Sequence, residues 1–384
     1  MRVCLFDWHH GGHHAAYLRG FARALRGSAE VVAAAPDVTL AEAALPRESV
    51  VSLGAPRPRP ASGADREGPG KAELANAELD VLAEVAAEVR PDQIVLLFAD
   101  PVLRWLVGRP QLTARTSICI HFPQSHFKRA YGVSAGGPTG RLRARFKDHL
   151  LARWARRGDA GALFVVDREA ARLWGGGGRA AFWLPEPPLD TPTHPQPWPR
   201  RGGAVLFGYL DSRKGVDRVA DALLADPAAG PVVLAGESAP EFRAELEGHV
   251  ARAQAGGADL QLRLGRLPGD EAMRMLGSAR CALLSFGWRP SASRVLLEAA
   301  ASGTPVVGSG HGTVGHLIRS HGLGIAVDPR RPREIAAGIR RLTEAEANPY
   351  AAGLDRYARQ MAGAGFAEAV AAGLGLREGT GAAA

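Results

Sequence analysis

Four histidines surround a Gly-Gly pair in the segment DWHHGGHHAAYLRG, residues 7–20. Imidazole nitrogens bind metal ions and glycines let backbone approach a ligand, so the segment suits either a metal site or a ligand-binding loop. A metal site needs at least three converging ligands. His9 and His10 would point opposite ways in an extended segment, and His13 and His14 would diverge around a helix. We therefore predict a ligand-binding loop and no metal site; the alternative is that these histidines only fill the structure.

A second group of charged residues lies in FGYLDSRKGVDRVADALL, residues 207–224. The pattern predicts a strand, a short polar loop and a helix that begins at Lys214-Gly215. Free backbone N–H groups and the helix dipole favour an anion at such a helix start, where Arg213 and Lys214 could reach it. The segment is therefore a candidate anion site, and the alternative is a solvated basic turn.

The third candidate is LLSFGWRPSASRVLLEAAASGTPVVGSG, residues 283–310. A loop with Ser291 and Ser293 leads into a predicted helix that carries Glu298. Hydroxyls and exposed amides at a helix start suit a phosphate. A carboxylate one to two turns into the helix can accept hydrogen bonds from both vicinal hydroxyls of a ribose. The alternative is a helix cap followed by an ordinary surface glutamate.

The candidate residues lie among short apolar runs, predicted to be strands, that alternate with predicted helices. These elements must position them. The runs are continuous, as is typical of strands covered on both faces; examples are RVCLF (2–6), QIVLLFA (93–99) and AVLFGYL (204–210). The alternation predicts an α/β protein with parallel, doubly wound sheets. In such sheets ligands bind beyond the carboxyl ends of the strands.

A proline-rich stretch predicts the boundary between two such domains. Residues 184–203 contain seven prolines, and the chain of 384 residues exceeds what one core usually supports. With two facing domains, we expect the site in the cleft between them. The predicted parts are a Rossmann-like domain (1–185), a linker (186–202), a second Rossmann-like domain (203–345), a helical segment packing back toward the first domain (346–376) and a flexible tail (377–384).

Composition fits a soluble globular protein, with 46% hydrophobic and 22% charged residues. The net charge of +8 comes mostly from arginine in an Ala/Gly/Arg/Pro-rich sequence of the kind that high-GC bacterial genomes encode. Basic stripes with aromatics and zinc-finger spacings are absent, so nucleic acid is not a predicted partner. Cys4, Cys119 and Cys281 lie in apolar runs and are predicted to be buried thiols. We expect a cytoplasmic protein without a secretory signal or membrane span.

Four motifs of the second half share their order and spacing with a known family. They are GYLDSRKGVDRV, LGRLPGDEAMRMLGSARCALLS, VLLEAAASGTPVVGSGHGTVGHLI and HGLGIAVDPRRPREIAAGIRRL. Over about residues 203–342, and more loosely before them, the sequence resembles the retaining glycosyltransferases of family 4 (glycosyl transferases group 1). The resemblance implies the GT-B fold, two Rossmann-like domains facing across a cleft. The first would bind the acceptor and the second a nucleotide-diphosphate sugar.

The resemblance also implies roles for individual residues. Lys214, with Arg213, would neutralise the donor diphosphate, which a divalent metal does in other transferases, so no metal or cofactor is expected. Glu298 would hold the ribose. His121, at the end of a predicted strand, would act in catalysis near the donor sugar, and His13 and His14 would contact the acceptor; a structural role for His121 is the alternative. The other donor-binding residues would be Gly11, Gly12, Gly208, Ser291, Ser293, Arg294 and Val295.

The sequence departs from the family pattern at three positions. The family has two glutamates separated by seven residues, and Pro290 stands where the first would lie. Tyr209 stands where an arginine is common, and His316 where an acidic residue is common. Two alternatives to a transferase therefore stay open. One is a catalytically degenerate sugar-nucleotide-binding protein, and the other is a different GT-B enzyme such as a nucleotide-sugar epimerase or a phosphorylase. We favour a transferase that acts with retention.

Residues 138–158 predict an amphipathic helix. Leu142, Phe146, Leu150 and Trp154 recur at helical spacing and are expected to pack inward, while arginines crowd the opposite face. In the family it resembles, such a basic face touches anionic membranes when the acceptor is membrane-linked. Two interpretations follow, peripheral contact with the inner membrane surface or a solvated face, and we favour the second.

Overall fold

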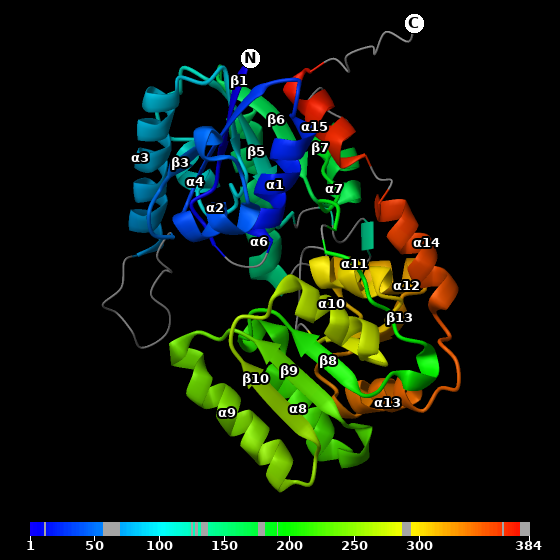
Figure 1. The fold of residues 1–384 in the computed structure, drawn as a ribbon. Helices are drawn as coiled ribbons and strands as arrows, with labels where there is room; N and C mark the ends of the chain where they lie inside the picture. The colour runs from blue at the N-terminus through cyan, green and yellow to red at the C-terminus, as the bar shows by residue number, and fades with distance from the viewer. Residues whose placement is uncertain are drawn as a thin grey trace, which may run out of the picture. The chain divides into compact units, whose positions relative to one another are not determined.

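The computed structural model describes residues 1–10, 13–56, 70–123, 126, 130–131, 137–175, 181–189, 191–285, 293–362 and 365–376. The chain divides into two compact units. The first comprises Met1–Pro188 with Gly365–Ala384, and the second comprises Leu189–Ala364. Each is built on a parallel sheet flanked by helices (Figure 1).

The first unit contains a seven-stranded sheet in the order β3-β2-β1-β4-β5-β6-β7. The chain builds outward from β1 in one direction and then continues from β4 in the other, so the strand order reverses between β1 and β4. The carboxyl ends of these two strands therefore form the crevice where doubly wound sheets bind ligands. The strands are β1 (Arg2–Phe6), β2 (Glu30–Ala35), β3 (Val50–Ser52), β4 (Gln93–Leu96), β5 (Arg115–Ile120), β6 (Ala160–Val165) and β7 (Ala181–Trp183).

The last described helix packs into the core of the first unit. Phe366, at the start of this helix, places its ring 5.4 Å from that of Phe21 and 6.3 Å from that of Tyr17. The helices of this unit are α1 (His14–Ala24), α2 (Asp37–Ala43), α3 (Lys71–Val89), α4 (Leu103–Leu106), α6 (Gly137–Trp154), α7 (Arg168–Gly175) and α15 (Phe366–Leu374).

The second unit contains a six-stranded sheet in the order β10-β9-β8-β11-β12-β13, which reverses between β8 and β11. Its strands are β8 (Ala204–Phe207), β9 (Val232–Gly236), β10 (Leu260–Leu264), β11 (Cys281–Leu284), β12 (Val306–Ser309) and β13 (Gly324–Val327). Its helices are α8 (Val216–Ala225), α9 (Pro240–Ala255), α10 (Gly269–Ser278), α11 (Arg294–Ala301), α12 (Gly312–His321), α13 (Pro332–Thr343) and α14 (Ala351–Ala362).

The expected parallel α/β architecture is confirmed, and the three cysteines are fully buried. The prediction that four apolar side chains of α6 pack inward is wrong for two of them. Leu150 and Trp154 are buried, but Leu142 is 70% exposed and Phe146 is 47% exposed. The core cluster includes Leu150, Leu151 and Trp154 near the C-terminal end of α6 but neither Leu142 nor Phe146, so the apolar periodicity extends beyond the surface that the helix buries. Among the described residues, none of the helices is both long and apolar enough to span a membrane.

Candidate active site

A buried carboxylate–imidazole pair lies at the carboxyl end of β1. Asp7 is 1% exposed, and its carboxylate accepts hydrogen bonds from Nδ1 of His14 at 2.7 Å and from the backbone N–H of His9 at 3.1 Å. An ionised carboxylate can only accept, so the shared proton belongs to Nδ1 of His14. The pair thereby fixes the orientation of the His14 ring at the first residue of α1.

The two partners shift each other's pKa in opposite directions. Burial disfavours the carboxylate of Asp7, but the charge and the hydrogen bond of His14 outweigh burial and lower the pKa of Asp7. Burial likewise disfavours the imidazolium of His14, but Asp7 outweighs it and raises the pKa of His14. A second buried carboxylate, Glu78 of α3, lies 3.4 Å from Nε2 of His9.

Three histidines of this segment form a stack. The rings of His9 and His14 lie 5.3 Å apart with an interplanar angle of 21°, and those of His13 and His14 lie 5.7 Å apart at 12°. The prediction that His13 and His14 diverge is therefore wrong. His13 precedes the helix, with φ −107° and ψ 7°, so the helical rotation of about 100° per residue does not separate the two rings.

His121 continues this stack from the end of β5. Its ring lies 5.4 Å from that of His13, and its Nε2 donates a hydrogen bond to the carbonyl of Leu97 at 2.9 Å. Its backbone N–H donates to Asp100, which also binds Lys147. Burial lowers the pKa of His121, so the ring is neutral at neutral pH. The first unit thus brings together three predicted site residues, His13, His14 and His121.

The ring nitrogens of the stacked histidines face different partners and do not converge on one point. Nδ1 of His14 faces Asp7, and Nε2 of His9 faces Glu78. Over the residues that the structure describes, no group of three or more His, Cys, Asp or Glu side chains is placed to hold a metal ion. The predicted residues Gly11, Gly12 and Ser291 lie outside the described part of the chain, as does Pro290.

The turn between β8 and α8 is locked against the end of β11. Gly215 has φ +73°, and a Cβ at this position would clash with the carbonyl oxygen of Ser285. Oγ of Ser285 in turn lies 3.0 Å from the carbonyl oxygen of Lys214. The backbone N–H of Lys214 donates to the carboxylate of Asp211 at 3.2 Å. The sequence Lys-Gly thus allows a tight turn at the place where the sheet order reverses.

Lys214 lies inside this turn, whereas its neighbour is exposed. Nζ of Lys214 donates to the carbonyl of Phe207 at 3.1 Å and passes over Gly208, which has φ +108° and no side chain to obstruct it. Arg213 is 79% exposed and pairs with Asp211 at 2.6 Å. Of the two predicted cations, Lys214 therefore has the fixed position.

Glu298 lies on α11 close to two cations. Nε of Arg294 lies 3.2 Å from Oε1 of Glu298, and the side chains are 15% and 19% exposed. Burial raises the pKa of Glu298, while the charges of Arg294 and Lys214 act in the opposite direction. The buried Ser293 directly precedes α11, and the half-buried Val295 lies in its first turn. The second unit thus gathers most of the predicted donor-binding residues at one edge of its sheet.

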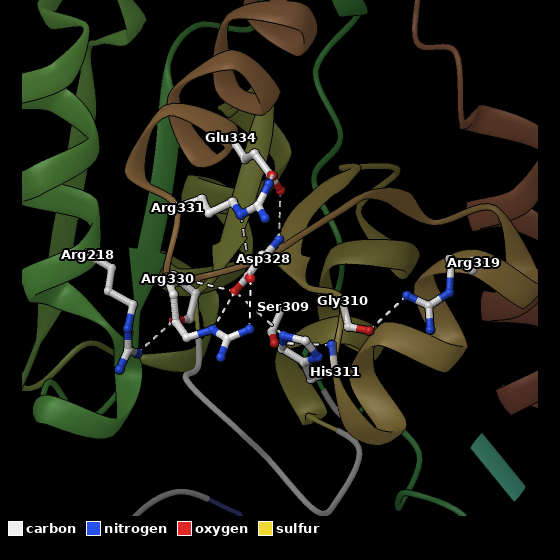
Figure 2. Close-up of polar contacts among 10 residues, drawn as sticks. Arg218, Ser309, Gly310, His311, Arg319, Asp328, Arg330, Arg331 and Glu334 are labelled. Carbon is white, nitrogen blue, oxygen red and sulfur yellow. Dashed lines mark hydrogen bonds and ion pairs between the residues drawn. The ribbon is translucent and has the colours of Figure 1, made fainter. Parts of the chain in front are cut away.

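A further polar cluster at the ends of β12 and β13 was missed by sequence reasoning (Figure 2). The carboxylate of Asp328 accepts hydrogen bonds from Nε and Nη2 of Arg330 at 3.0 and 2.9 Å, and Nε2 of His311 lies 3.6 Å away. These hydrogen bonds, led by that of Arg330, hold the pKa of Asp328 well below its usual range. The sequence DPRR resembles a solvated charge run, and only the structure shows that His311, which precedes α12, lies beside Asp328.

Comparisons with known proteins concern the second unit and the fold of the whole chain. Residues 204–361 match the family model "Glycosyl transferases group 1". Sucrose-phosphate synthase from Thermosynechococcus elongatus is similar in structure, with 18% identity over 97% of each chain and a TM-score of 0.64. WaaG, a glycosyltransferase involved in lipopolysaccharide biosynthesis, shares 16% identity over 98% of this chain and 100% of its own, with a TM-score of 0.60.

The fold is GT-B. A third similar structure, Anabaena HepE in complex with UDP, is 15% identical over 94% of this chain and 95% of its own, with a TM-score of 0.60. No curated protein sequence matches the chain. The GT-B fold confirms the expected fold, and the group 1 match covers most of the second unit.

The buried Asp7–His14 pair makes stability depend on pH. The raised pKa of His14 gives stability that is present below its unfolded pKa of about 6.5 and is lost as pH rises through the folded value. The lowered pKa of Asp7 gives stability that is present above about 3.8 and is lost as pH falls through the folded value. We therefore expect Asp7→Asn to cost about 3–5 kcal/mol in urea unfolding at pH 5.5, and clearly less at pH 9.

The control is Asp80→Asn, which removes an exposed ion pair with Arg109 and should change stability little at either pH. Equal losses for Asp7→Asn at pH 5.5 and pH 9 would contradict an ionic Asp7–His14 pair.

Proposed function

We propose that the protein transfers a sugar from a nucleotide-diphosphate-sugar donor, of the UDP class, to an acceptor, with retention and without a metal ion. The observation that carries the proposal is the meeting of Lys214, Arg294 and Glu298 at the carboxyl edge of a sheet that matches the group 1 family model. The UDP bound to HepE, which shares the fold, supports the choice of nucleotide. Retention rests on the resemblance to family 4.

Departure of the diphosphate is the step in which negative charge develops. A fixed cation near that charge lowers the barrier without reorganisation. The ammonium of Lys214 is hydrogen-bonded to the carbonyl of Phe207, which orients it. The first amides of α8 and α11 add positive potential at the same edge. These groups would do the work of a metal ion, while Glu298 accepts hydrogen bonds from the ribose.

The first unit would bind the acceptor. Its stack of His13, His14 and His121 lies at the ends of β1 and β5, beside the point where the strand order reverses. The ring of His14 is held by Asp7, so a hydroxyl of the acceptor would meet an imidazole of fixed orientation.

A second candidate function is sugar-nucleotide binding without turnover. It is favoured by Pro290, which stands in place of the first family glutamate, and by Tyr209, which stands in place of an arginine. Release of free nucleotide from a donor separates the two functions, because a binding protein gives none.

Lys214→Ala should lower the rate of nucleotide release by at least two orders of magnitude, because it removes the fixed cation from the leaving diphosphate. The assay follows UDP release from a panel of UDP-sugars in EDTA. Arg213→Ala, which removes an exposed neighbouring cation, is the matched control and should have a much smaller effect. Near-normal activity of Lys214→Ala would remove the proposed role.

We also propose that α6 contacts anionic membrane surfaces. Leu142 and Phe146 are exposed apolar side chains on α6, and Arg141 and Arg145 beside them are exposed as well. The guanidinium of Arg104 lies 5.9 Å from the ring centre of Phe146. Apolar side chains bordered by arginines on one helix suit the interface of a bilayer with anionic headgroups.

The double change Leu142→Ser, Phe146→Ser should reduce co-sedimentation with phosphatidylglycerol-containing vesicles at least several-fold, because it removes the apolar anchor and keeps every arginine. Vesicles of phosphatidylcholine alone should bind neither protein. Equal binding of both proteins to anionic vesicles would show that the exposed apolar residues take no part.

A further inference from the structure

Arg294 and Glu298 form an ion pair along one face of α11. Residues four apart on a helix are neighbours, and the contact joins Nε of Arg294 to Oε1 of Glu298 at 3.2 Å. The two side chains are only 15% and 19% exposed. Water and salt screen such a pair less than a surface pair, so each charge strongly affects the other.

Among the described residues, Arg294 and Lys214 are the charged groups that act on the Glu298 carboxylate. Arg294 comes from the same helix and Lys214 from the turn between β8 and α8, while burial favours the neutral acid and raises the pKa of Glu298. An ionised carboxylate offers about four sites that accept hydrogen bonds, whereas a protonated one becomes partly a donor. The cations therefore act against burial and favour the ionised form, which can accept from two hydroxyls at once.

The position of Arg294 also separates its role from that of Lys214. The charge of Arg294 is opposed at close range by Glu298, so its field at a nearby diphosphate is weakened. Lys214 instead donates to the neutral carbonyl of Phe207. The resemblance to family 4 groups Arg294 with the phosphate-binding loop, whereas the structure places its guanidinium against the glutamate.

We propose that Arg294 is a positioning residue that acts through Glu298, holding this carboxylate ionised and oriented to accept hydrogen bonds from the ribose 2′- and 3′-hydroxyls. It is not a ligand of the phosphates. The proposal rests on the proposed function, because it assumes that the second unit binds a nucleoside diphosphate.

The test is isothermal titration at pH 7.5 in EDTA with UDP, GDP, ADP and CDP, followed by the 2′,3′-dideoxy analogue of the tightest ligand. Wild type should prefer the ribonucleotide by about tenfold or more, since hydrogen bonds to a charged group are lost in the analogue. Arg294→Ala should lose most of this preference, and Arg294→Lys should restore part of it. Inorganic pyrophosphate should compete with the nucleotide equally well in all three proteins.

A pH series gives a second readout that loss of structure would not imitate. Removing Arg294 removes a charge that lowers the pKa of Glu298, so that pKa rises further. Ribonucleotide affinity should then begin to fall at a higher pH in Arg294→Ala than in wild type as the solution is acidified. The dideoxy analogue should show no such displacement.

Arg274→Ala is the matched control, because it breaks another i,i+4 ion pair of the same unit, with Asp270 at 2.8 Å on α10. It should leave all affinities unchanged. Arg294→Gln keeps a side chain of similar polarity and replaces the alanine variant if that protein does not fold.

Two results overturn the proposal, and they distinguish failure of the role of Arg294 from failure of the proposed function. If Arg294→Ala or Arg294→Gln keeps the ribose preference and weakens pyrophosphate and both nucleotides equally, Arg294 is a phosphate ligand. If wild type binds none of the four nucleotides, the proposed function fails together with this inference.

Discussion

A carboxylate buried at the end of a strand must have a cationic or hydrogen-bonding partner, and this requirement shapes the first unit. Each of three strands is followed by such a carboxylate, which draws a side chain from another part of the unit onto the edge of the sheet. The pairs are Asp7–His14 after β1, Asp100–Lys147 after β4 and His126–Asp167 after β6. The first of them joins the end of β1 to the first residue of α1, where the stack of histidines lies.

At the corresponding carboxyl edge of its own sheet, the second unit uses glycines and backbone carbonyls instead of buried carboxylates. Gly215 allows the turn after β8 to pass against Ser285, and Gly208 leaves room for the side chain of Lys214. The ammonium of Lys214 then bonds to a backbone carbonyl, so its charge stays at the edge where α8 and α11 begin. The edge of the first unit is thus built of buried ion pairs, and that of the second unit of a glycine-containing turn that fixes a lysine.

The apolar runs predicted the parallel sheets because buried strands must be apolar on both faces. They missed β7 and β13, which are short strands at sheet edges. Periodicity identified α6 but not how far the core extends beneath it, so Leu142 and Phe146 were assigned inward. The histidine stack was missed because helical geometry was assumed for His13, which precedes the helix.

The Arg294–Glu298 spacing was visible in the sequence, but only the structure shows that the two side chains meet. Sequence patterns identify neighbours along one helix, whereas the partner of a charge also depends on burial and on loops from other strands. The charge of Lys214 acts on Glu298 from a turn more than eighty residues earlier in the chain, which no local sequence pattern could indicate.

The most direct test of a metal-free nucleotide site is thermal unfolding with UDP, GDP, dTDP, ADP and CDP, each with and without EDTA. A ligand at about a hundred times its dissociation constant stabilises by roughly 2.7 kcal/mol, which shifts the melting temperature of domains of this size by several degrees. We expect UDP to raise the melting temperature equally with and without EDTA. No shift with any nucleotide, together with a clear shift with zinc or nickel, would contradict it and make the histidine segment a metal site.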